Sequence, residues 1–114
     1  MIDLYIGVAQ VSLLIRHAQS LKDKRKIVQS LLQKLKNQGF SAAEIAFAEE
    51  PKRATLGFSF VANSPSYLDK ILDDALRLFV GDFEVLDSQR RVFDFSGEEE
   101  TTMSEDDDLK FGLE

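Results

Sequence analysis

Basic side chains gather around the start of one predicted helix, in an arrangement that suits the binding of an anionic group. Lys22, Lys24, Arg25 and Lys26 fall within its first two turns, and Arg16 precedes it. Cations oppose the positive end of the helix dipole there, at a cost of about a few tenths of a kcal/mol each. Cations at the start of a helix go against the usual preference for acids there, and such a departure is a mild indication of function. Backbone N–H groups and these side chains together would bind a phosphate or a carboxylate.

Lys24 differs from the other cations in its place on the helix. At 100° per residue, Lys22, Arg25 and Lys26 share a polar face, whereas Lys24 falls near the centre of the apolar stripe. Its ammonium group must therefore extend to solvent, pair with an acid such as Glu44, or point into a pocket. The competing interpretation of the whole cluster is a solvated helix face with one buried lysine stem.

The sequence offers no constellation for catalysis. His17 is the only imidazole and has no obvious Ser or Asp partner, and the chain has no Cys. Nucleophile-elbow, phosphate-loop and zinc-protease motifs are all missing, and the acidic run 106–108 lacks the spacing of a calcium loop. We therefore expect no catalytic residues, no metal and no cofactor.

Two strand segments look like the RNP1 and RNP2 segments of RNA-recognition domains, 57–61 and 4–7. Those domains stack bases on outward-facing aromatic side chains. If Phe58 and Phe60 faced outward, however, only Gly57 and Ser59 would remain to fill the core side of the strand. The alternation therefore favours core phenylalanines over base stacking.

Periodicity predicts six elements that would position these residues. Strands are expected over 4–15, 40–48, 53–62 and 83–95, the last of them irregular near 88–90. Helices are expected after Ser20 and Ser64, ending at Gly39 and Gly81. The order β-α-β-β-α-β predicts an α+β, ferredoxin-like fold, in which a four-stranded antiparallel sheet carries both helices on one face.

The other face of such a sheet needs water or a partner. Counting from the predicted core positions of the first strand, Leu4, Ile6 and Val8 lie on this open face. Aliphatic side chains on a solvated face indicate self-association or a protein partner. These three residues are the candidate anchors for that interaction.

Composition and charge divide the chain of 114 residues into two parts. Residues 1–96 have thirteen basic and twelve acidic side chains and form the predicted domain, whereas residues 97–114 have one lysine and eight acids. The second part is expected to be a solvated, disordered acidic tail, of which 113–114 resemble a cloning scar. No run is long enough to span a membrane, and the lack of Cys fits a cytoplasmic protein.

Scattered residues over 4–95 resemble the small bacterial YlxP-like family, a domain of unknown function. The resemblance rests on one set of residues: Gly7, Ser20, Leu21, Lys22, Lys24, Arg25, Glu44, Arg53, Ala54, Leu56 and Gly57. It implies a ferredoxin-like fold and no established activity. Family members are often encoded beside translation and ribosome-maturation factors, which implies association with RNA or ribosomes. Pro51-Lys52 stands where the family commonly has Trp-Gln.

Two hypotheses follow. The first is a non-catalytic binding module that contacts structured RNA or a ribosomal particle through the cluster at the helix start. The alternative is a protein–protein adaptor or homo-oligomer that uses the open sheet face.

Overall fold

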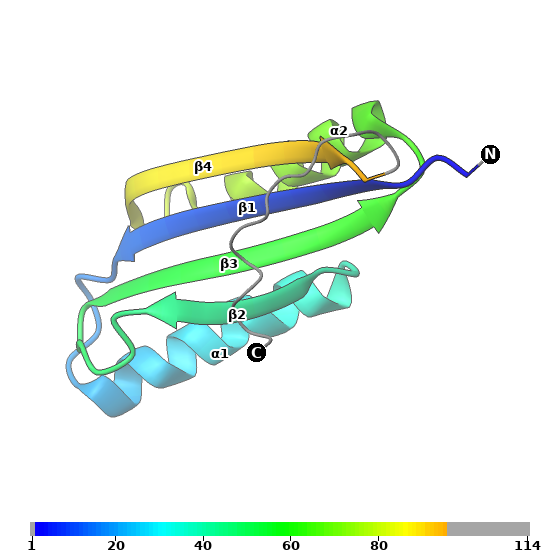
Figure 1. Ribbon diagram of the computed structural model, residues 1–114. Coiled ribbons are helices and arrows are strands. Elements are labelled where there is room, and N and C mark those ends of the chain that lie inside the picture. The colour runs from blue at the N-terminus through cyan, green and yellow to red at the C-terminus, as the bar shows by residue number, and fades with distance from the viewer. Residues whose placement is uncertain (1, 96–114) are drawn as a thin grey trace.

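The computed structural model describes residues 2–95, so the predicted acidic tail lies outside the described range. The elements are β1 (Tyr5–Leu14), α1 (Leu21–Asn37), β2 (Ser41–Ala46), β3 (Arg53–Ala62), α2 (Pro65–Leu76), a 3₁₀ turn η1 (Arg77–Phe79) and β4 (Glu84–Asp94). The strands pair antiparallel in the order β2-β3-β1-β4, and both helices cover one face of the sheet (Figure 1). The predicted ferredoxin-like fold is confirmed.

Both helices begin at the N-cap residues that the sequence predicts, and α1 also ends where Gly39 predicts. The Ser20 Oγ atom accepts the backbone N–H of Asp23 at 3.0 Å, and the Asp23 carboxylate accepts the N–H of Gln19 at 2.9 Å. The Ser64 Oγ atom caps α2 in the same way, with Pro65 at its first position. Gly39 follows α1 with φ +100°, a conformation that disfavours any residue with a Cβ atom.

The core lies between the sheet and the helices. Odd-numbered residues of β1 point into it, and Leu13 and Ile15 have no exposed surface. Leu56 and Phe58 of β3 are buried beside them, which supports the prediction of core phenylalanines over base stacking. The remaining core residues come mainly from the apolar faces of the helices: Val28, Leu31, Leu35, Leu68, Leu72, Ala75 and Phe79.

Three features of the elements differ from the predicted ones. β2 is shorter than 40–48, and α2 ends at Leu76 because the chain tightens into η1 before Gly81. The irregularity of β4 lies at Leu86, where Ser12 pairs with Asp87 but Leu13 pairs with Val85. The lapse of apolar residues at 88–90 indicated the wrong position, because that stretch pairs regularly with β1.

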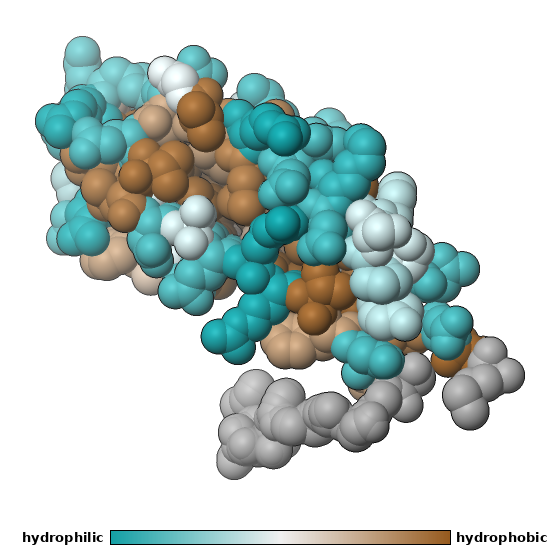
Figure 2. Space-filling model, turned by 90° about the horizontal axis from the view of Figure 1, so that it is seen from above, coloured by the Kyte–Doolittle hydropathy of each residue, from teal (hydrophilic) through white to brown (hydrophobic). Residues whose placement is uncertain are grey.

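Apolar side chains remain on the outside of the molecule near both ends of β4. Figure 2, which looks down on the sheet edge that β4 forms, shows two brown regions separated by polar atoms. Val80, Val85 and Leu86 are exposed near the start of the strand, and Phe93 and Phe95 near its end. None of the helices within residues 2–95 is long and apolar enough to span a membrane.

Candidate functional site

Helix α1 turns one face to the sheet and the other to solvent. Its inner face packs Val28, Leu31 and Leu35 against the core. Its outer face consists almost entirely of polar and charged residues, because the apolar positions recur at helical spacing. This outer face is therefore available to a partner along the whole helix.

Five cations lie exposed on α1, and we call them the α1 basic face: Lys22, Arg25, Lys26, Lys34 and Lys36. The only acid of the helix is Asp23, whose carboxylate is engaged in capping. Lys22 and Lys36 are fourteen residues apart, so at 1.5 Å per residue the cations extend over about 21 Å. Extended positive charge on one helix suits a polyanion better than a small ligand.

Most of these cations are without a protein counter-charge. Arg25 Nη2 lies 3.4 Å from both carboxylate oxygens of Glu49, but both side chains are exposed, so the pair is weak. Within residues 2–95, the side chains of Lys22, Lys26, Lys34 and Lys36 make no hydrogen bond or ion pair. The α1 basic face thus keeps its positive charge.

Helix α2 is arranged differently, because its charges neutralise one another. Asp74 pairs with Lys70 at 3.0 Å and with Arg77 at 2.7 Å. The hydrogen bond from Lys70 lowers the pKa of Asp74, and the charge of Lys70 and the contact with Arg77 act in the same direction. Asp73 pairs with Arg90 of β4 at 3.3 Å. The uncompensated charge of the two helices is therefore concentrated on α1.

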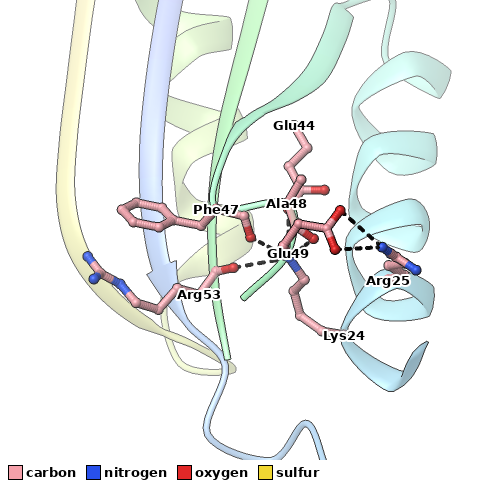
Figure 3. A network of polar contacts seen from close by, with 7 residues as sticks. All are labelled: Lys24, Arg25, Glu44, Phe47, Ala48, Glu49 and Arg53. Atoms are coloured by element: carbon pink, nitrogen blue, oxygen red, sulfur yellow. Dashed lines mark hydrogen bonds and ion pairs between the residues drawn. The ribbon is translucent and has the colours of Figure 1, made fainter. Parts of the chain in front are cut away.

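Lys24 does not belong to this exposed set, although the sequence grouped it with the anion-binding candidates. Its side chain is fully buried, and its Nζ atom donates to the Glu44 carboxylate at 2.8 Å. The same ammonium lies within hydrogen-bond distance of three backbone carbonyl oxygens, those of Phe47, Ala48 and Arg53, at 2.9–3.4 Å (Figure 3). Lys24 cannot bind a surface anion, because four protein oxygens already surround its charge. Of the three options for this lysine, pairing with Glu44 is the one found.

Two of the carbonyl oxygens that surround Lys24 belong to the turn between β2 and β3, and the third is that of Arg53, the first residue of β3. Phe47 has a positive φ of 66°, which is uncommon for a residue other than glycine. The Arg53 guanidinium lies 4.1 Å from the centroid of the Phe47 ring and stabilises the same turn from outside. Lys24 thus has a structural task, which is to hold this turn against α1.

Arg16 is only partly available for the predicted anion site, because its side chain already has an acidic partner. Its guanidinium pairs with Glu84 at the start of β4, at 2.8 Å. The backbone around Arg16 is fixed by Lys52, whose ammonium donates to the carbonyl oxygens of Arg16 and Ala18.

His17 contacts the Phe83 ring at a centroid distance of 5.8 Å. Across residues 2–95, no three His, Asp or Glu side chains gather in a way that could hold a metal ion.

Comparison with known proteins places the chain in a family. Residues 6–90 match the model of a family described as protein of unknown function (DUF503). The chain belongs to this family. The expectation of a family without known function is thereby confirmed at this level, and no curated protein matches the sequence.

A search of solved structures adds little about this DUF503 protein. A crystal structure from Bacillus cereus, of a protein proposed to be an antibiotic biosynthesis monooxygenase, aligns with a TM-score of 0.39 and 8% identity. The alignment covers 87% of this chain and 99% of that one. Likeness at this level carries no argument about function.

The structure of the DUF503 protein also adds a groove that sequence patterns did not reveal. It has a volume of about 280 Å³ and lies between α1 and the residues around η1 and the start of β4. Ile27, Leu78 and Phe83 form apolar parts of its lining, and Lys26 and Lys34 lie along its α1 side. The spacing of Lys26 and Lys34 places them on one face of α1. The apolar wall of the groove could not be predicted, because Leu78 and Phe83 are distant from α1 in the sequence.

The open sheet face of this DUF503 protein carries the other predicted candidates. Leu4, Ile6 and Val8 alternate with the core residues of β1, and Val8 is 38% exposed. Sequence alternation found these three residues. It did not find their neighbours on the same face, Val61 and Phe93, which pair with Ile6 from β3 and β4.

Proposed function

We propose that the protein is a non-catalytic binding module that contacts structured RNA, free or in a ribosomal particle, through the α1 basic face. The observation that carries the proposal is the set of four exposed lysines that have no counter-charge among residues 2–95. Such lysines attract a polyanion strongly, because no internal ion pair has to be broken on binding. The resemblance to YlxP-like proteins supports RNA as the polyanion.

The contact residues differ from the set that the sequence indicated. Lys22, Arg25 and Lys26 are retained, and Lys34 and Lys36 extend the surface along the helix. Lys24 is removed because it is buried. Arg16 has a minor role, because binding RNA would compete with its pair to Glu84.

The mechanism is phosphate contact without reading of bases. Lysine ammonium groups act as point charges that neutralise phosphates and release counterions. Each phosphate contact on RNA should contribute about 0.7–0.9 to the slope of log affinity against log salt concentration. Binding is therefore expected to tolerate changes of sequence and to weaken steeply as salt rises.

The test compares two variants of the full chain by fluorescence anisotropy with a labelled RNA hairpin. Lys22→Gln combined with Lys26→Gln should weaken binding at low salt by about tenfold or more and reduce the salt slope by about 1.5. Lys70→Gln is the matched control, because Lys70 is an exposed lysine on α2 that already has a carboxylate partner. Its affinity should stay at the level of the unaltered chain.

Three results would contradict the proposal. One is equal binding by the double variant and the unaltered chain. Another is an equal loss in the Lys70→Gln control, which would mean that net charge matters and the location does not. The third is the absence of any salt-dependent binding to the hairpin or to purified ribosomal subunits at low salt.

A further inference from the structure

Several apolar side chains are exposed on the open face of the sheet. Val8 and Phe93 are 38% and 43% exposed, and Val61 is 60% exposed. Ile45 lies above Gly57, where a Cβ atom would be 3.4 Å from its side chain. Contiguous apolar side chains on a sheet face are a mark of an interaction surface, whereas single ones are ordinary.

The surface of this face has two hollows, one on each side of Val8. A hollow of about 330 Å³ lies on one side of Val8, where Ala43, Gly57 and Ser59 provide little bulk. A second hollow of about 310 Å³ lies on the other side, next to Gln89, Arg91 and Phe93 of β4. Val8 therefore stands as a ridge between two hollows. A surface with a ridge and hollows of similar size can receive an identical surface.

The size of the face is right for a pair of chains. β1 and β3 are ten residues long. At about 3.4 Å per residue and 4.8 Å between strands, the four-stranded face measures roughly 34 Å by 19 Å, or about 600 Å² in projection. A standard stable interface buries about 800 Å² of accessible surface per partner, and side-chain relief raises the accessible area above the projection.

The charges of this face also permit two copies to meet. Asp87 and Arg91 lie two residues to either side of Gln89 on the open side of β4, and Glu84 is paired with Arg16. The face thus has cations and acids close together. The strongly positive α1 lies on the opposite side of the sheet, so the two copies of the α1 basic face stay apart (Figure 1).

We infer that the open sheet face binds the same face of a second copy of this chain. The pair has two-fold symmetry, so each copy inserts its Val8 ridge into a hollow of the other, as an isologous interface requires. The second copy is favoured over an unrelated protein because both the relief and the charges of the face complement themselves. The interface is separate from the RNA contacts proposed above.

The experiment measures the mass and the dissociation constant of the full chain by sedimentation velocity and equilibrium. The unaltered chain should sediment as a dimer at about 50 µM, as expected for micromolar or tighter affinity. Val8→Asp should raise the dimer dissociation constant by about 100-fold or more, because each pair receives the change twice. Ser59→Arg, which fills a hollow from its floor and points away from the core, should have a similar effect.

Val80→Asp is the matched control. Val80 is a valine with 71% exposure that lies outside the open face. The dimer of this variant should be unchanged, and circular dichroism should show that all three variants keep the fold. The inference is overturned if the unaltered chain is a monomer over the measured range. It is also overturned if Val8→Asp still dimerises as before, or if Val80→Asp separates the pair as strongly.

Discussion

A fully buried lysine must find acceptors for three N–H groups, and Lys24 finds them on β2, on the turn after it and at the start of β3. Glu44 in β2 supplies a carboxylate, and the turn and Arg53 supply carbonyl oxygens. The charge is thereby compensated where water cannot reach it. This one side chain joins the start of α1 to the far end of the β2–β3 hairpin.

Replacing Lys24 by methionine tests this role at the residue scale. Met keeps most of the stem but leaves Glu44 and the turn carbonyl oxygens without their donor, so the free energy of unfolding should fall by about 3 kcal/mol. Lys22→Met is the control, because Lys22 is exposed and free of partners within residues 2–95, and it should change stability by less than about 0.5 kcal/mol. Urea denaturation measures both.

Equal stability of the two methionine variants would show that the Lys24 network contributes nothing to the fold. A Lys24→Met variant that stays stable but loses RNA binding would instead return Lys24 to the functional set. The two outcomes are distinguishable because stability and binding are measured on the same sample.

The sequence predicted part of this network. The helical stripe placed Lys24 among apolar neighbours, and pairing with an acid such as Glu44 was one of its three possible environments. The carbonyl acceptors could not be predicted. They depend on the conformation of Phe47 and on the path from there to Arg53, which are set by tertiary packing.

At the scale of elements, the glycine that follows each helical segment has a different environment. Gly39 and Gly81 share a φ of +100°, which L-residues rarely adopt. A Cβ atom on Gly39 would lie 2.8 Å from the Phe60 ring, whereas one on Gly81 would meet nothing within 4 Å. Phe60 is held in turn by the Phe40 and Tyr67 rings, so it cannot move away freely.

Alanine at these two positions separates backbone strain from steric crowding. Gly81→Ala should cost about 1 kcal/mol, because only the backbone conformation is unfavourable. Gly39→Ala should cost about 2–3 kcal/mol, because crowding against an aromatic cluster adds to the same strain. Thermal unfolding of both variants measures the difference, and equal costs would mean that the contact with Phe60 relaxes without penalty.

The order and type of all six main elements followed from periodicity and capping residues, because these signals are local. The end of α2, the 3₁₀ turn after it and the bulge at Leu86 did not. The bulge is a change in the register between β4 and β1 near the start of β4, and no local pattern of residues marks it. The α1 cations were likewise predicted from their spacing along the helix. The absence of ion pairs at the four lysines within residues 2–95 could not be predicted, because it depends on where acidic residues distant in the sequence lie in the fold.

At the scale of the whole molecule, the two proposals define a specific geometry. Two sheets meeting face to face are about 10 Å apart, and the helices lie on the outside of such a pair. With about 5 Å for half of each sheet layer and about 10 Å for each helix, the two copies of the α1 basic face lie roughly 40 Å apart on opposite surfaces. The proposed dimer would therefore be a bivalent ligand for any RNA long enough to reach both surfaces.

Bivalence gives a prediction that neither proposal makes alone. The unaltered chain should bind a long RNA about 100-fold more tightly than Val8→Asp does, since the second contact becomes intramolecular. On a short hairpin that covers a single α1, the two proteins should bind equally, because Val8 alternates with the core residues of β1 and so lies on the side of the sheet away from α1. Anisotropy titrations with both RNAs at one salt concentration measure the two ratios. A loss of the same size on both RNAs would mean that the open face itself contacts RNA, and equal binding on the long RNA would mean that the two surfaces never act together.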